Sequence, residues 1–64
     1  MPIITIEGPK VEDIQKKRDF VKEITKTTAS YFNMPEESII ILIRENEPQN
    51  VSVGGRLIID KNRK

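Results

Sequence analysis

The chain of 64 residues contains no histidine, no cysteine and no tryptophan. Without histidine it lacks the commonest general base near neutral pH, and without cysteine it lacks thiolate nucleophiles and disulfide bonds. Most zinc sites are excluded for the same reason, because they are built from these two residue types. We therefore expect a protein that uses no metal and no cofactor.

An excess of one charge and a long apolar run are also missing. Eleven Lys and Arg residues against ten Asp and Glu give a net charge of +1, which does not favour a nucleic-acid or anionic-membrane partner. The longest apolar run, residues 39–43, is far shorter than the ~20 residues of a membrane span. No signal peptide is visible, so we expect a cytoplasmic protein. The basic residues Lys61, Arg63 and Lys64 are commonplace at a terminus and are weak candidates for nucleic-acid contact.

The short length limits the chain to one domain, residues 1–64. A domain of this size buries only about 60% of its unfolded surface and usually needs an additional source of stability. Disulfides are excluded and no metal-ligand cluster is visible. Oligomerisation is therefore the expected source of stability.

The apolar pattern predicts an α/β fold in the order strand, helix, strand and hairpin. Residues 3–7 are β-branched and precede Gly8 and Pro9, which indicates a strand ending in a turn. Residues 12–32 have the period of an amphipathic helix, with Asn33 as its C-terminal cap. The apolar face predicted for this helix comprises Ile14, Phe20, Val21, Ile24, Thr28, Tyr31 and Phe32.

Residues 38–44 form a second predicted strand without polar alternation, so both of its faces should be buried. The helix can cover one face, but no second helix exists to cover the other, so another subunit must do so. The strand–helix–strand order predicts a parallel pair with a right-handed crossover. A hairpin over residues 51–59 and a solvated tail over residues 60–64 complete the prediction.

Pro2 is the main candidate for chemistry. A small residue after Met1 is the usual context for removing the initiator methionine, which would leave a secondary amine at the start of the first strand. An α-amino group has a reference pKa of about 7.7–8.0, and desolvation or nearby cations lower it. Such an amine can act as a general base without a histidine. The alternative is an ordinary strand start.

The sequence resembles the 4-oxalocrotonate tautomerase family over nearly its whole length. The resemblance is carried by Pro2 with its apolar strand, Gly8, residues 33–35, Glu45 and residues 51–55. It implies a β-α-β protomer that dimerises into a four-stranded sheet and assembles as a trimer of dimers. It also implies that Pro2 shuttles a proton between an enol and its keto acid. The typical substrates are 2-hydroxymuconate or related dienols, whose carboxylates are held by arginines.

Three positions depart from the family pattern. The arginine that usually follows the first-loop glycine is replaced here by the sequence Gly8-Pro9-Lys10. Lys10 is therefore the first candidate for a carboxylate-binding cation, although a lysine lacks the bidentate fork of arginine. The usual arginine of the second strand aligns with Ile40, and the usual aromatic wall aligns with Val51. Arg44 is the second candidate cation, with a solvated strand end or a salt bridge to a neighbouring glutamate as the alternative.

The other polar side chains are weaker candidates. The remaining cations are Lys17, Arg18 and Arg56, and the first two are better explained as helix surface. The acidic residues are better explained as a solvated helix face: Asp13, Asp19 and Glu23. Tyr31 can be a general acid, but its spacing favours a core aromatic with the hydroxyl at the rim. The Gly-Gly pair indicates a hairpin turn and not a phosphate loop.

The sequence therefore predicts an isomerase, a keto–enol tautomerase of small 2-oxo acids. Pro2 is the base and then the acid, Lys10 or Arg44 binds the carboxylate, and Ile40 and Val51 exclude water from the amine. Two alternatives remain open. One is a non-catalytic oligomeric binding module on the same scaffold, and the other is a Pro2-dependent hydratase or dehalogenase.

Overall fold

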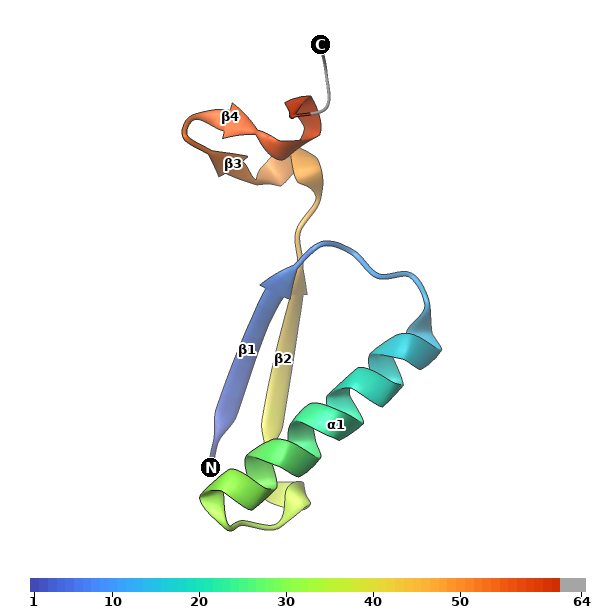
Figure 1. Ribbon diagram of the computed structural model, residues 1–64, viewed down its shortest axis with the longest axis vertical. Coiled ribbons are helices and arrows are strands. Elements are labelled where there is room, and N and C mark those ends of the chain that lie inside the picture. The colour runs from blue at the N-terminus through green and yellow to red at the C-terminus, as the bar shows by residue number, and fades with distance from the viewer. Residues whose placement is uncertain (62–64) are drawn as a thin grey trace.

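The computed structural model describes residues 1–61 and has a β-α-β unit at its centre (Figure 1). Strand β1 (Ile3–Gly8) and strand β2 (Ile40–Glu45) are joined through helix α1 (Ile14–Phe32). The strands are parallel, in a register that pairs Ile3 with Ile40 and Gly8 with Glu45. The predicted α/β fold and parallel pairing are confirmed.

Helix α1 begins at Ile14, two residues later than predicted. Asp13 lies before it with extended backbone angles, and its carboxylate accepts hydrogen bonds from the N–H groups of Gln15 at 3.0 Å and Lys16 at 3.3 Å. An aspartate in this position satisfies amide groups that the first helical turn leaves free. Asp13 is therefore the N-terminal cap of α1: it is exposed to solvent as predicted, but it lies just before the helix and not on its face.

The other end of α1 agrees with its prediction. Asn33 has a φ of 54°, in the left-handed region that asparagine tolerates better than most residues. Its N–H donates to the carbonyl of Ser30 at 3.3 Å, and the N–H of Met34 donates to that of Ala29 at 3.0 Å. These bonds satisfy carbonyl groups of the last turn and end the helix.

Short 3₁₀ turns shorten two of the predicted strands. Glu36–Ser38 forms such a turn, so β2 begins at Ile40 and not at residue 38. The hairpin consists of β3 (Ser52–Val53) and β4 (Arg56–Leu57), and Ile58–Asp60 forms another 3₁₀ turn after it. The predicted strand through residue 59 is therefore wrong at its end, while residues 62–64 of the predicted tail lie outside the described residues.

The hairpin lies beyond the carboxyl ends of β1 and β2, away from α1 (Figure 1). Its turn places Gly54 and Gly55 at φ values of 62° and 82°. Two consecutive positive φ angles are typical of the tight turns that match the twist of a hairpin, and glycine adopts them without strain. The prediction of a hairpin turn here is confirmed.

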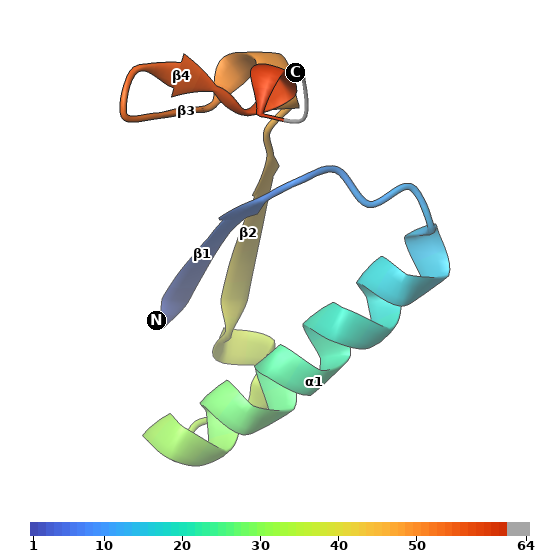
Figure 2. The same ribbon diagram turned by 45° about the horizontal axis from the view of Figure 1, so that its top comes forward.

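Helix α1 lies across one face of the two-stranded sheet (Figure 2). The strand residues on that face are half-buried and in register with one another: Ile4, Ile6, Ile41 and Ile43. On the opposite face Ile3 is 54% exposed and Leu42 is 47% exposed, and nothing within residues 1–61 covers them. The expected burial of both faces of β2 is therefore not met within one chain.

The predicted apolar face of α1 is only partly correct. Its middle residues Val21, Ile24 and Thr28 are half-buried against the sheet, and Ala29 is the one buried residue within positions 1–61. The remaining members are exposed, namely Ile14, Phe20, Tyr31 and Phe32. A helix of 19 residues is about 29 Å long, whereas strands of six residues span about 20 Å. The helix is therefore longer than the strands, and it runs obliquely to them (Figure 1).

The protomer is extended and has almost no core of its own. Its radius of gyration is 15.5 Å, whereas a compact chain of this length has about 11 Å. Its principal dimensions are 49 × 25 × 13 Å. Such a shape agrees with the expectation that the fold is stabilised by association. Within residues 1–61 no helix has the length and apolar character needed to cross a membrane.

Candidate functional site

Pro2 lies at the start of β1 and is held there by the neighbouring strand. Its carbonyl oxygen accepts a hydrogen bond from the N–H of Ile40 at 3.0 Å. The residue is half-buried, whereas Met1 before it is 78% exposed. The hydrogen bond thus holds Pro2 through its backbone carbonyl and does not involve its nitrogen. Met1, before it, is exposed.

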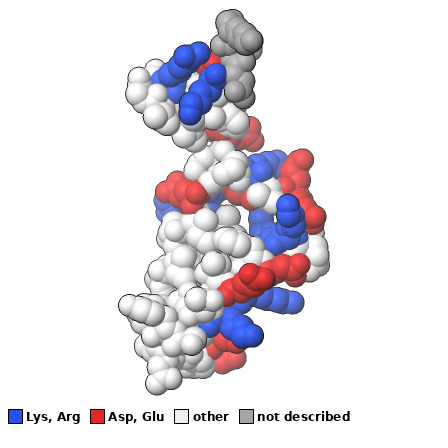
Figure 3. All heavy atoms as spheres, in the orientation of Figure 1, with Lys and Arg blue, Asp and Glu red and all other residues white. Residues whose placement is uncertain are grey.

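Pro2 lines a hollow of about 440 Å³ between the start of β1 and the end of α1. The lining residues are Pro2, Ile3, Ile4, Thr27, Thr28, Tyr31 and Phe32. None of them is charged, and few charged atoms surround this end of the molecule on the side seen in Figure 3. The hollow therefore places no charged side chain beside Pro2.

Tyr31 stands at the edge of this hollow and is 82% exposed. Its ring meets that of Phe32 edge to face, with 5.0 Å between the centroids and an interplanar angle of 88°. The interpretation of Tyr31 as a core aromatic is therefore wrong. Helical spacing alone placed it toward the sheet, but α1 extends past the sheet at this point.

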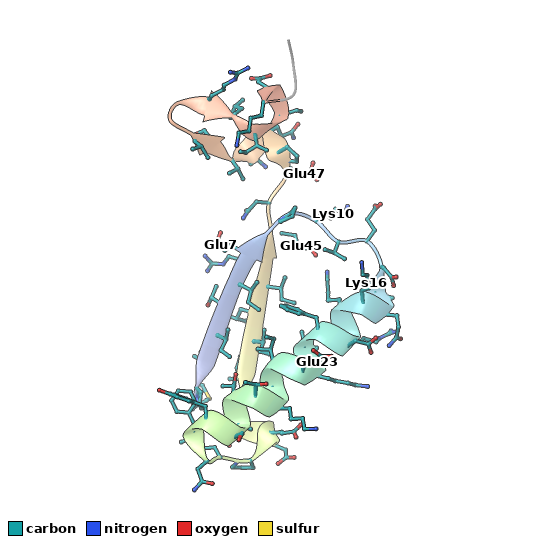
Figure 4. All side chains as sticks on the ribbon, in the orientation of Figure 1. Glu7, Lys10, Lys16, Glu23, Glu45 and Glu47 are labelled. Carbon is teal, nitrogen blue, oxygen red and sulfur yellow. The ribbon has the colours of Figure 1, made fainter. Side chains whose placement is uncertain are left out.

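The predicted cations lie at the other end of the strands. Lys10 is in the loop after β1, and Arg44 is on the uncovered face of β2, opposite Glu7 in the register. Figure 4 shows Glu7, Lys10 and Glu45 close to the carboxyl ends of the strands, far from the N-terminus. The six residues of β1 separate these positions from Pro2 by about 20 Å.

The two predicted wall residues are likewise separated. Ile40 is half-buried and is hydrogen-bonded to Pro2, so it lies at the Pro2 end. Val51 lines a different hollow, of about 450 Å³, together with Pro9 and Asn46. Within one chain the structure therefore brings only Ile40 next to Pro2, out of the four residues predicted to accompany it.

An ion pair that the sequence analysis missed ties α1 to the end of β2. The Lys17 ammonium lies 2.9 Å from a Glu45 carboxylate oxygen, and the side chains are 29% and 22% exposed. The N–H of Val11 donates to the same oxygen at 3.1 Å. The hydrogen bond from Lys17 and then that from Val11 hold the pKa of the Glu45 carboxyl below its usual value of 4.5.

The assignment of Lys17 to the helix surface is therefore only partly correct. Its position was detectable, because Lys17 precedes Val21 by four residues and so shares the helix face that packs on the sheet. A lysine on such a face lays its methylene stem along apolar surface and extends its charge to the edge. With Glu45 and Phe20 it lines a hollow of about 420 Å³ between α1 and the strands.

The other sequence candidates have local structural partners. Arg18 donates to the Gln15 side chain at 3.4 Å, and Arg56 donates to the carbonyl of Asp60 at 3.1 Å. Asp19 accepts from the Gln15 side-chain amide at 3.0 Å. Within residues 1–61 the only ion pair is that between Lys17 and Glu45. The suggested salt bridge of Arg44 with a neighbouring glutamate is therefore not formed in this part of the chain. Arg63 and Lys64 lie outside the described residues.

Comparison with known proteins gives a consistent family. The family model described as "Tautomerase enzyme" matches residues 2–61 and thus begins at Pro2. Comparison with curated proteins gave no match. Among solved structures, the chain is similar to DmpI from Archaeoglobus fulgidus, with 44% identity and a TM-score of 0.82, over 92% of this chain and 100% of that one.

Two further structures share the fold at lower identity. One is a heterohexamer 4-oxalocrotonate tautomerase from Chloroflexus aurantiacus J-10-fl, with 19% identity and a TM-score of 0.83, over 97% of this chain and 100% of that one. The other is DmpI from Helicobacter pylori, with 20% identity and a TM-score of 0.76, over 91% of this chain and 97% of that one.

Proposed function

The chain belongs to the tautomerase family, and we propose that it is a keto–enol tautomerase of small 2-oxo acids that uses Pro2 as its base. The observation that carries the proposal is the position of Pro2. It heads β1 in an uncharged hollow, at the residue where the family match begins. Resemblance to the 4-oxalocrotonate tautomerases supports this assignment, since their amino-terminal proline transfers the proton.

The proposed reaction starts after removal of Met1, because Pro2 N in the peptide bond to Met1 is an amide nitrogen without basicity. The freed secondary amine takes a proton from the enol oxygen, or from a carbon next to the carbonyl, and returns it to another position. The hydrogen bond from Ile40 to the Pro2 carbonyl holds the ring in place during this transfer. The uncharged lining keeps the amine in its neutral form.

A carboxylate substrate also needs a cation, which one chain does not supply beside Pro2. Strand β1 pairs with β2 along one edge only within residues 1–61. If the other edge of β1 pairs antiparallel and centred with β1 of a second copy, Pro2 of one copy lies opposite Pro9 of the other. Lys10 of the second copy then stands beside the amine. We propose that Lys10 binds the substrate carboxylate in this way and stabilises enolate charge.

The same pairing extends the sheet to four strands, and we propose that it builds a homohexamer as a trimer of dimers. The extended protomer and the uncovered face with Ile3 and Leu42 support association of this kind. The mass of the native assembly, measured by native mass spectrometry, tests the proposal. A monomer at micromolar concentration would contradict it.

The test of the chemistry combines intact mass and activity on one preparation from the natural host. We expect loss of Met1 and turnover of phenylenolpyruvate or 2-hydroxymuconate. Pro2→Ala leaves a primary amine, so some activity should persist, but the rate should fall by about tenfold to a hundredfold. Pro35→Ala is the matched control, because Pro35 is exposed and does not line the hollow.

Three results would overturn the assignment. An unchanged rate in Pro2→Ala would remove Pro2 from the mechanism. Retained Met1, or a free Pro2 without turnover of any enol, would favour a binding role on the same scaffold. Borohydride trapping of a substrate on Pro2 would instead favour covalent chemistry of the hydratase or dehalogenase kind.

A further inference from the structure

The hollow at Pro2 is aromatic on the side formed by α1. Tyr31 and Phe32 contribute both rings, and the threonine hydroxyls of residues 27 and 28 are the other side-chain polar groups in the lining. Tyr31 is 82% exposed, and its ring contacts that of Phe32 edge to face. A flat apolar group entering beside Pro2 would therefore meet an aromatic surface.

This side of the hollow is also unsuited to a carboxylate. It adjoins the C-terminal end of α1, where aligned peptide dipoles give a partial negative charge. The last turn of α1 contains no basic side chain that would compensate this charge. A substrate carboxylate is therefore favoured away from α1, toward the edge of β1, and the opposite end of the substrate points at Tyr31.

We propose that Tyr31 is a specificity-determining residue that forms the aromatic wall of the Pro2 site. The site then selects enols that carry one carboxylate and an aryl or other flat apolar substituent over dicarboxylate dienols. This inference rests on the proposed function and deepens it. The family pattern places an aromatic wall at position 51, where this chain has the small Val51, and here α1 supplies the aromatic side chains that line the Pro2 hollow.

The kinetic test compares kcat/KM for phenylenolpyruvate and for 2-hydroxymuconate in the processed protein. Wild type should prefer the aryl substrate. Tyr31→Ala should lower kcat/KM for phenylenolpyruvate by about tenfold, mainly through KM, and leave the dicarboxylate nearly unchanged. Tyr31→Phe should retain the preference, because the ring and not the hydroxyl makes the wall. Phe20→Ala is the matched control, since it truncates an exposed aromatic of the same helix in a different hollow.

A binding measurement decides the inference without turnover. Tyr31 is the sole tyrosine and the chain has no tryptophan, so intrinsic fluorescence reports on this side chain alone. Phenylpropanoate, which has an aryl group and one carboxylate, should change the fluorescence in a saturable way. Adipate, a saturated dicarboxylate, should not.

The outcomes separate the two proposals. Pro2-dependent turnover with no aryl preference, or with an equal loss on both substrates in Tyr31→Ala, overturns the role of Tyr31 and leaves the tautomerase assignment intact. Dissociation of the assembly in Tyr31→Ala, measured by native mass spectrometry, likewise overturns the role of Tyr31 in specificity. Saturable phenylpropanoate binding without Pro2-dependent turnover overturns the enzymatic assignment and keeps Tyr31 as a ligand contact. Absence of both overturns both proposals.

Discussion

The two ends of the β1–β2 pair differ sharply in chemistry. The amino end has Pro2, Ile40 and an uncharged hollow with two aromatic rings. The carboxyl end gathers the charged residues Glu7, Lys10, Lys17, Arg44 and Glu45. In the proposed function, the first end keeps the amine neutral and the second binds the substrate carboxylate. Neither end alone can do both.

If Pro2 and Lys10 act together as proposed, this separation means that one copy of the 64-residue chain does not complete the site. Parallel strands within a protomer keep the two ends about 20 Å apart. In the proposed antiparallel pairing one copy is reversed, so that the uncharged end of one copy would meet the charged end of the other. Activity should then depend directly on assembly, and substitutions at the sheet face and at either end can test that dependence.

Leu42→Glu should have the largest effect, because it places a charge on the uncovered face of the sheet that we expect to be buried by other copies. An unpaired charge buried in this way costs about 3–5 kcal/mol, which should dissociate the assembly and abolish most activity. Lys22→Glu on the exposed side of α1 is the control and should leave both unchanged. Native mass spectrometry and the phenylenolpyruvate assay measure the result. An active hexamer in Leu42→Glu would contradict the proposed mode of assembly.

Lys10→Ala should have the next largest effect, because it removes the proposed cation while leaving the amine and the assembly in place. A hydrogen bond to a charged group contributes about 1.5–3 kcal/mol, so KM should rise by about tenfold or more. Lys10→Arg should restore much of the affinity. Lys16→Ala is the control, because Lys16 is another exposed lysine on the side of the molecule where the strands have their carboxyl ends. Equal KM values for the two alanine variants would exclude a specific role of Lys10.

The sequence predicts the elements well and their ends less well. The apolar patterns identify β1, α1 and β2, and Asn33 and the Gly-Gly pair mark the end of α1 and the hairpin turn. The start of α1 was misplaced because acidic residues favour both the first turn and the cap, and only the hydrogen bonds of Asp13 distinguish these positions.

Of the residues that the sequence predicts for the candidate site, one chain brings together only Pro2 and Ile40. The position of Tyr31 depends on how far α1 extends past a two-stranded sheet, and spacing within the helix does not contain that information. The pairing of Lys17 with Glu45 joins residues 28 positions apart, so it required the relative placement of α1 and β2. The distance between Pro2 and Lys10 likewise follows from the strand direction and not from their closeness in the sequence.

Asp13→Ala should have a smaller effect than Lys10→Ala, and this effect should be on the stability of the fold. Loss of the two hydrogen bonds to the first turn of α1 should lower the free energy of unfolding by about 1 kcal/mol. Asp19→Ala is the matched control, because Asp19 accepts only from a side-chain amide within residues 1–61. Thermal unfolding of the two variants at equal protein concentration measures the difference. Equal losses of stability would contradict the capping role.

Glu45→Gln should have the smallest effect, and that effect should depend on pH. The pKa of Glu45 is lowered in the folded chain by Lys17 and then by Val11, so its contribution to stability is present above the usual value of 4.5. The contribution is lost as the pH falls through the lower folded value. Wild type should therefore lose stability more steeply below about pH 4.5 than Glu45→Gln. The difference should shrink in high salt, because both side chains are partly exposed.

The control is Glu47→Gln, which changes an exposed loop residue that forms no ion pair within residues 1–61 and should follow wild type. Parallel curves for wild type and Glu45→Gln across this range would show that the ion pair does not stabilise the junction of α1 and β2.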